Sequence, residues 1–294
     1  MINNSIRMKR LKSLSFKNKG LLLLALCITF GFNATAQYKE NTEVGLIGGI
    51  SYYLGDLNTT HFFQNSPTAG LIVRKNIDER FSYKAEALYL TLHSDERDSE
   101  DTIAADRGLH FRSSVFELSG QLEFNFLPYE SGNPLYTWTP FNYVGISLFH
   151  HNPQAENTNG EWIDLQPLGT EGQGTTLFPE KKIYPLIQFA IPMGGGVKIA
   201  VNESFNIILE YGARKTFTDY LDDVSTNFVG GVKPNGVLDP YPQEMSPEAI
   251  EMSDPSGTHY KGVQRGDPNK KDWYSFLGVT LSFKLSNNTK GCDY

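Results

Sequence analysis

The sequence has little cysteine, no excess of basic residues and few long apolar runs, and each shortage excludes a class of protein. Its 294 residues include only Cys27 and Cys292, so a disulfide framework or cysteine metal site within one chain is excluded once the N-terminal segment is removed. Lysine and arginine number 26 against 33 acidic residues, which argues against nucleic acid as a partner because its binding needs a basic surface. Only one stretch, near the N-terminus, resembles a membrane helix, which excludes a multi-helix membrane protein.

That apolar stretch has the pattern of a signal peptide. Residues 1–19 carry six basic residues and no acidic one, residues 20–32 are largely apolar, and Ala34-Thr35-Ala36 forms a cleavage site. The alternative is a membrane anchor, but the run is shorter than the roughly 20 residues that a spanning helix needs. We expect a cleaved signal peptide at 1–36 and one exported domain at 37–294. That domain keeps 20 basic and 33 acidic residues, a net charge of −13.

Alternation of apolar and polar residues dominates the rest of the chain. In the final segment, Leu277, Val279, Leu281, Phe283 and Leu285 alternate with small or polar residues, as in a strand with one apolar face. Similar segments lie at about 43–54, 67–75, 80–92, 116–126, 141–149, 187–200 and 204–214. This makes about eight strands, each roughly long enough to cross a bilayer when tilted. Pro192 is awkward inside a strand and predicts a bulge or interruption in the sixth.

The connections alternate in length. Residues 76–79 and 201–203 form short turns, whereas the connections at about 93–109, 150–186 and 215–272 are long. Short periplasmic turns and long external loops are typical of bacterial outer-membrane barrels. We therefore predict an all-β fold, an eight-stranded antiparallel up-and-down transmembrane β-barrel in the outer membrane. A short helix is predicted to begin at Ser246-Pro247-Glu248 and to end near Met252.

One periplasmic connection, about 128–140, is longer and aromatic. It carries Tyr129, Tyr136 and Trp138. These side chains are interpreted either as part of an aromatic girdle at the membrane interface or as a contact for a periplasmic partner.

The polar faces of the expected strands carry charges that neither a sandwich core nor a lipid-facing wall tolerates. They are Arg74, Lys84, Glu86, Glu117, Glu123, Lys198 and Glu210. Inside a narrow eight-stranded barrel these charges can pair with one another around little water. The alternative is a soluble barrel or sandwich that turns them to solvent and buries the aromatics on its opposite faces.

No pattern of catalytic or metal-binding residues stands out. The six histidines lie in no recognisable spacing with serine or aspartate, and His150-His151 would point to opposite faces of a strand. Asp219, Asp222 and Asp223 lack the spacing of a calcium loop, so we interpret them as turn-capping residues. The glycine-rich segment 169–174 lacks the lysine of a phosphate loop and is interpreted as a shaped external turn. We predict no enzymatic activity, no cofactor and no metal.

Five segments in the same order carry a family resemblance. They are GGISYYLGDL (48–57), FRSSVFELS with EFNF (111–119 and 123–126), FHHNPQA (149–155), LQPLGTEGQG (165–174) and RKTFTDYLDDVS (214–225). Together they resemble the PorG family, an outer-membrane β-barrel component of the type IX secretion system of Bacteroidota. The motif residues taken as candidate structural or interaction residues are Gly49, Tyr53, Gly55, Asp56, Asn152, Pro153, Gln166, Pro167, Gly169, Glu171, Gly172, Gly174, Arg214, Asp219, Tyr220, Asp222 and Asp223.

The resemblance implies a scaffold in protein secretion and gliding motility. Its partners would be outer-membrane lipid and the periplasmic ring of the PorK lipoprotein and PorN, called GldK and GldN in gliding bacteria. The motif-rich loops would either fold over the barrel mouth as a lid, which we favour, or meet another outer-membrane component. The stretch at about 230–270 matches nothing in the family. Two alternatives are a small barrel enzyme acting on lipids and a passive porin or adhesin.

Overall fold

Eight long strands form a closed barrel in the computed structural model, which describes residues 40–285. Each pairs antiparallel with its neighbours along the chain, and β3 pairs with β4 while β1 pairs with β12, which closes the sheet. The strands are β1 (Asn41–Leu54), β2 (Ser66–Asn76), β3 (Phe81–Asp95), β4 (His110–Asn125), β5 (Trp138–His150), β8 (Ile187–Ala200), β9 (Phe205–Thr216) and β12 (Trp273–Leu285). The predicted eight-stranded up-and-down barrel is thus confirmed. The predicted signal peptide lies outside the described residues.

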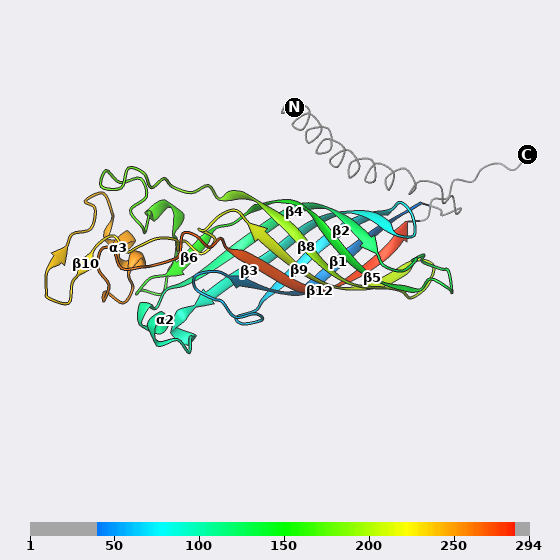
Figure 1. The fold of residues 1–294 in the computed structure, drawn as a ribbon, viewed down its shortest axis with the longest axis horizontal. Coiled ribbons are helices and arrows are strands. Elements are labelled where there is room, and N and C mark those ends of the chain that lie inside the picture. The colour runs from blue at the N-terminus through cyan, green and yellow to red at the C-terminus, as the bar shows by residue number, and fades with distance from the viewer. Residues whose placement is uncertain (1–39, 286–294) are drawn as a thin grey trace, which may run out of the picture. The chain divides into compact units, whose positions relative to one another are not determined.

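Two tight turns and one longer connection lie at one end of the barrel, and the two longest connections lie at the other (Figure 1). The short-turn end has the connections 77–80, 126–137 and 201–204, and the loop end has 55–65, 96–109, 151–186 and 217–272. The loop end also carries η1 (Glu96–Asp98), α2 (Thr102–Arg107), β6 (Pro153–Glu156), β7 (Trp162–Asp164), η2 (Gln166–Leu168), β10 (Gly231–Val232), β11 (Leu238–Asp239) and α3 (Pro247–Ser253). Within residues 40–285, no helix has both the length and the apolar character needed to cross a membrane.

The helix α3 forms where its sequence predicts it. The Ser246 hydroxyl accepts a hydrogen bond from the Ala249 amide at 3.0 Å, and Pro247 occupies the first turn. Both features stabilise the start of a helix. The Ser246 hydroxyl satisfies an amide that has no partner within the helix, and Pro247 has no amide hydrogen that needs one.

The alternation along each strand separates an apolar outer wall from a polar interior. On β4, exposed and buried residues alternate along the strand, and the exposed ones include Phe116 and Leu118. The outer wall is most prominent at Ile146, whose side chain is 75% exposed. A closed barrel has no free strand edges, so its whole wall can face hydrocarbon without unpaired backbone groups.

Ion pairs fill the interior. Glu123 on β4 lies 2.7 Å from Arg74 and 2.6 Å from Lys198, and Arg74 also pairs with Glu43 at 3.1 Å. All seven charges that the sequence assigns to the interior are buried there. Glu43 belongs to the same network but was missed, because it lies near the expected edge of the first strand.

A second set of charges lies in the same interior. Lys84 contacts Glu210 at 2.7 Å and Glu86 at 3.0 Å. Arg214 contacts Glu86 at 2.7 Å and Glu117 at 3.1 Å. Buried charges persist only when paired in this way, and the paired side chains leave the barrel core occupied.

Pro192 interrupts one ladder without a bulge. Between β5 and β8, Val144 pairs with Met193 and Ser147 pairs with Ala190, but the two intervening pairs are missing. The register is the same on both sides of the gap, so no residue is inserted. The cause is that proline has no amide hydrogen to donate to β5.

We expect Glu123→Gln to destabilise the barrel by about 3 to 5 kcal/mol, because it leaves buried cations without their carboxylate. The measurement is the loss of the folded band on unheated SDS gels across a urea titration in detergent. The matched control is Glu40→Gln, which removes an exposed pair with Lys75 and should change stability by at most about 1 kcal/mol. Equal effects of the two substitutions would contradict a structural role for the interior network.

Candidate functional site

The short-turn end is closed by the connection 126–137, which we call the arm. The Tyr129 amide donates to the Glu79 carbonyl at 3.2 Å, and the Ser131 hydroxyl donates to Asn206 Oδ1 at 2.8 Å. Glu79 precedes β3 and Asn206 belongs to β9, and these two strands lie on opposite sides of the barrel in the strand order. The arm therefore crosses the barrel mouth.

The three aromatics predicted at this end occupy different positions. Tyr129 is only 2% exposed, so it cannot present its ring to a partner. Trp138 begins β5 on the outer wall and pairs with Ile199, both of them exposed, which is the position of a girdle residue. Tyr136 is partly exposed and closes a turn in which its amide donates to the Asn133 carbonyl at 3.1 Å.

The loop end is closed by a packed cap, formed by the loops 151–186 and 217–272. Glu171 lies at its centre and is fully buried. Its carboxylate accepts hydrogen bonds from the Ser225 amide at 2.9 Å and the Thr226 hydroxyl at 2.6 Å, and pairs with Arg265 at 3.1 Å. Burial opposes ionisation, but Arg265 and these hydrogen bonds hold the pKa of Glu171 below its usual value. Glu171 thus joins three distant segments of chain.

Asp223 is a second buried carboxylate in the cap. It accepts hydrogen bonds from the Tyr184 hydroxyl at 2.7 Å and from the Thr170 hydroxyl, while its own carbonyl accepts from Arg265 at 2.6 Å. Burial raises the pKa of Asp223 to about 6, against the opposing effect of Arg265. The Tyr184 ring stacks on Tyr220 with centroids 4.7 Å apart, so the same residues join polar and apolar packing.

The cap is fastened to the barrel by a tyrosine between two carboxyl groups. The Tyr53 hydroxyl, at the end of β1, lies 2.5 Å from Asp222 and 3.1 Å from Asp272. Neither carboxyl forms an ion pair with a described residue. Burial raises the pKa of both Asp222 and Asp272 well above its usual value, and nearby negative charges add to the effect, that of Asp272 at Asp222 and that of Asp219 at Asp272.

Glycine is required at particular points of this cap. Gly169 and Gly172 have φ values of 62° and 79°, which a side chain disfavours. A Cβ on Gly55 would lie 2.0 Å from the Tyr53 hydroxyl and 2.1 Å from Asp272, so only glycine fits beside the fastening. The glycine-rich motif is therefore a shaped turn, as its sequence suggested.

Most of the remaining motif residues also lie in or against the cap. Asp56 accepts from the Asp267 amide at 3.0 Å, and Asp219 accepts from the Ser225 hydroxyl at 2.6 Å. Gln166 donates to the Tyr184 carbonyl at 2.9 Å. Others are Asn152, which donates to Asp164, Pro153 in β6, Pro167 in η2, Gly174, whose amide donates to Lys181, and Tyr220.

Two motif residues lie in the barrel instead. Arg214 is a buried member of the interior ion-pair network, so its place in the structure is compatible with the structural role and not with the interaction role. Gly49 is on β1, where a Cβ would lie 2.2 Å from the Leu277 carbonyl oxygen. It permits close packing of two strands.

Sequence reasoning missed several residues that hold the cap together. Arg265 and Asp272 belong to the end of the longest loop, and Tyr184 and Thr226 lie outside the resembling segments. The sequence feature that could have indicated Arg265 is that it is the one arginine in a long loop rich in proline and acidic residues.

The cap holds no catalytic geometry around its histidines. His259 Nδ1 lies 3.2 Å from Ser256 and 3.0 Å from Asp254, but both contacts use one nitrogen, whereas a catalytic triad needs both. His151 is buried, and burial and the neighbouring His150 lower its pKa to about 4. Among residues 40–285, no three histidine, cysteine or acidic side chains are arranged to hold a metal ion.

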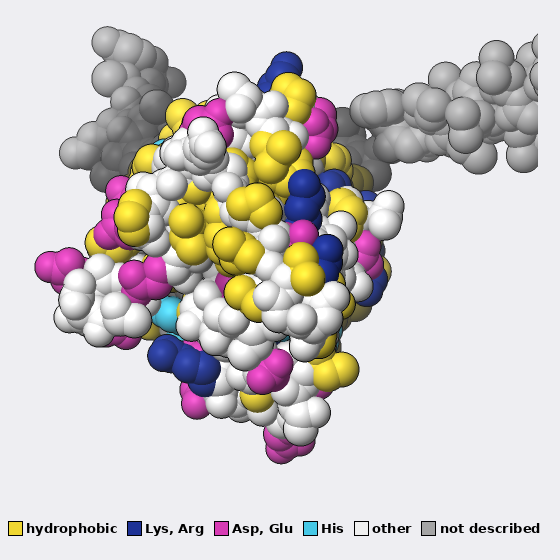
Figure 2. Space-filling view, turned by 90° about the vertical axis from the view of Figure 1, so that its left-hand side faces the viewer, with side chains coloured by type: hydrophobic (Ala, Val, Ile, Leu, Met, Phe, Trp, Pro, Cys, Tyr) yellow, Lys and Arg dark blue, Asp and Glu magenta, His cyan; other side chains and the backbone are white. Residues whose placement is uncertain are grey.

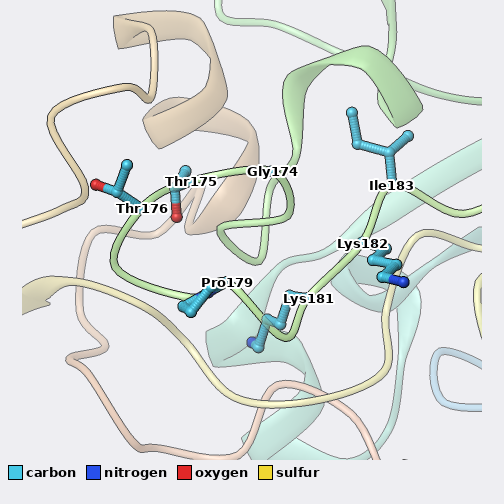
Figure 3. A pocket seen from close by; sticks show the side chains of 7 residues that line it. All are labelled: Gly174, Thr175, Thr176, Pro179, Lys181, Lys182 and Ile183. Carbon is cyan, nitrogen blue, oxygen red and sulfur yellow. The ribbon is translucent and has the colours of Figure 1, made fainter.

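A hollow of about 520 Å³ on the cap surface is formed by the loop at residues 174–183 (Figure 3). It is lined by Gly174, Thr175, Thr176, Pro179, Lys181, Lys182 and Ile183. The Lys181 amine is already engaged, because it donates to the Glu171 carbonyl at 3.0 Å and to Thr226 at 2.7 Å. The Lys181 amine is therefore not free to bind a ligand in the hollow.

The face of the cap farthest from the barrel is partly apolar. Figure 2 shows hydrophobic side chains gathered near its centre, with charged side chains around them. Exposed apolar residues of the cap loops include Leu177, Ile183, Val232, Val237 and Leu238.

A closed barrel with an apolar wall, a charged interior and loops gathered at one end is the architecture of a bacterial outer-membrane barrel. Residues 19–165, which are half of the 294-residue chain, match the family described as Domain of unknown function (DUF6089). The chain belongs to the DUF6089 family. No curated protein sequence matches it.

Among solved structures, the chain is similar to outer-membrane barrels at low identity. Neisserial surface protein A is 7% identical, with a TM-score of 0.41 over 84% of this chain and 99% of that one. Ail of Yersinia pestis is 8% identical, with a TM-score of 0.37 over 84% and 99%. OprG of Pseudomonas aeruginosa is 8% identical, with a TM-score of 0.36 over 85% and 98%. The barrel assignment for this DUF6089 protein rests on its own strand pairing.

The fastening of the cap should weaken as pH rises. A folded-state pKa that is raised contributes stability at low pH that is lost as pH rises through that value, and Asp222 and Asp272 are of this kind. The pKa of Glu171 is shifted in the opposite direction, below its usual value, so its contribution to stability is lost only when the pH falls into the acidic range. Hydrogen exchange in 217–230, corrected for intrinsic rates, should therefore increase between about pH 5 and about pH 9.

Asp222→Asn should reduce that pH dependence at its alkaline end, since it removes one of the two carboxyl groups beside Tyr53 and keeps an acceptor for the Tyr53 hydroxyl, while Asp223, with a pKa of about 6, is unchanged. The control, Asp78→Asn, lies at the short-turn end and should leave the profile unchanged. A profile that is equally steep in Asp222→Asn would show that this fastening does not hold the cap.

In planar bilayers the purified protein should show no steady ion conductance, because ion pairs occupy the interior and both mouths are covered. Shortening the arm to a two-residue turn should also leave the bilayer silent, since the interior side chains remain. Steady conductance from the unaltered protein would contradict a filled barrel.

Proposed function

We propose that this protein is a non-enzymatic outer-membrane component of the type IX protein secretion and gliding machinery. It would hold the periplasmic ring of PorK-like and PorN-like proteins, GldK and GldN in gliding bacteria, at the outer membrane. The observation that carries the proposal is the filled and doubly covered barrel, which leaves the end surfaces for function. The PorG-like segments support it, because they supply Glu171 and Asp223, the two buried carboxylates around which the cap is built.

The arm is the feature best suited to meet a periplasmic partner. It is held in one shape by hydrogen bonds from the Glu130 amide to the Tyr136 carbonyl and from the Asn133 amide to the Glu130 carbonyl. Leu135 projects from this support and is 81% exposed. A preorganised apolar side chain loses little entropy on binding, so Leu135 is our candidate for the centre of the ring contact.

Leu135→Asp should reduce co-purification of the PorK-like and PorN-like proteins from detergent-solubilised outer membranes. If Leu135 is central, the loss corresponds to about 2 kcal/mol, or roughly 30-fold weaker binding. The matched control is Ile103→Asp in α2, which is also very exposed, at 77%, but lies at the loop end.

Retention of the ring proteins by Leu135→Asp, with the barrel folded, would exclude the arm as the contact. Normal secretion and ring assembly in a strain that lacks the whole gene would reject the secretion role itself. The two results are independent of each other.

A second candidate is an adhesin-like role at the loop end. The pair Val232 and Leu238 on β10 and β11 favours it, because both side chains are exposed on a separate two-stranded sheet. If the protein has that role, Leu135→Asp should not change its binding to a surface partner. Leu238→Asp should reduce that binding.

A further inference from the structure

The connection between β1 and β2 folds back along the outside of the barrel. The Phe62 ring lies 5.0 Å from the ring of Tyr52 and 6.1 Å from that of Tyr211, measured between centroids. Tyr52 on β1 and Tyr211 on β9 occupy outward positions, two strands apart across β12. We call residues 61–63 the flap.

The flap reaches below the upper edge of the apolar wall. That edge is marked by Lys215 and Trp273, which pair across β9 and β12, with the Lys215 amine 5.7 Å from the indole ring. Tryptophan and lysine at a strand end are typical of the membrane interface. Tyr211 lies four residues nearer the middle of the wall than Lys215, so the Phe62 ring that packs on it lies on the hydrocarbon side of that edge.

The backbone of this connection is held in a costly conformation. Phe62 and Gln64 have φ values of 59° and 53°, a region that costs a non-glycine residue about 1 kcal/mol or more. The Gln64 amide group exchanges two hydrogen bonds with the backbone of Asp95, at 2.9 and 3.0 Å. Asn65 donates to the Phe62 carbonyl at 2.7 Å. These bonds fix the direction in which the flap projects.

A polar cluster lies beneath the flap. The Tyr52 hydroxyl is 2.8 Å from the Tyr211 hydroxyl and 3.0 Å from His61 Nδ1, and the whole Tyr52 side chain is buried. Polar groups on a lipid-facing wall are costly unless they are paired and shielded. The flap supplies both the partner, His61, and the cover, Phe62.

We propose that the flap is a lipid-inserted anchor, in which Phe62 and Phe63 enter the acyl-chain region of the membrane on the cap side. The Phe62 ring remains half exposed after packing on Tyr52 and Tyr211, and the adjacent Phe63 is 40% exposed. The occupant of this surface is the hydrocarbon of the surrounding lipid. Such an anchor fixes how deeply the barrel sits, independently of any role in secretion.

Site-directed spin labelling tests the anchor. The full chain, with Cys27 and Cys292 replaced by serine, is labelled at Phe63→Cys and reconstituted in phosphatidylcholine vesicles. Collision rates with oxygen, which concentrates in lipid, are compared with those of a water-soluble nickel chelate. The reference positions are Leu46→Cys on the outer wall and Ile103→Cys in α2 at the loop end, both strongly exposed.

The ratio of oxygen to nickel collisions at position 63 should match that at position 46 and exceed that at position 103 several-fold. A ratio equal to that at position 103 would overturn the proposal, because the flap would then lie in water. Each labelled variant must show the unheated folded band on SDS gels. Phe62→Cys serves as a second labelling position and should give the same ranking as position 63.

Discussion

The barrel depends on the pairing of charges inside a wall that faces hydrocarbon. Glu123 lies within 3.7 Å of three cations, Arg74, Lys84 and Lys198, each from a different strand. These groups cannot face lipid, and an unpaired charge inside the barrel would be very costly. Strand closure brings them together, and their pairing in turn fills the space that a pore would need. The remaining surfaces for function are the wall and the two ends.

The cap extends the same principle to loops that have little regular structure. Long loops carry backbone amides that need partners when they are buried. Glu171 receives the amides of Ser225 and Thr226, and Asp272 receives the amide of Leu221 at 2.9 Å. Buried carboxylates thus accept the backbone hydrogen bonds that carbonyl groups accept in a strand or helix. At Tyr53 the acids Asp222 and Asp272 have no basic partner among the described residues, which is the basis of the pH dependence expected for the cap.

The two ends and the upper wall differ in what they offer. The short-turn end presents one rigid arm with a projecting leucine. The loop end presents a broad face on which apolar and charged residues are mixed (Figure 2). Between them, the flap carries aromatic rings down the outer wall. Each surface has a separate physical basis, so a change to one should leave the others intact.

The sequence by itself determined the barrel. A strand alternates its side chains between two faces whatever its partners are, so the strand expected at about 187–200 is β8, although β4 begins at His110 rather than at the expected 116. The inward face of each strand was readable for the same reason, and the Ser246 cap is a local signal. These features depend on neighbours a few positions away.

Only the tertiary structure decided the partners in the cap. Arg265 meets Glu171 across 94 residues, from a stretch with no recognisable motif, and Tyr53 meets Asp272 across 219. Arg214 belongs to a motif but lies in the barrel, and Tyr129 belongs to an aromatic loop but is buried. Such contacts depend on where long connections return to the barrel. That path is set by packing and hydrogen bonding among several loops at once, which no period in the sequence records.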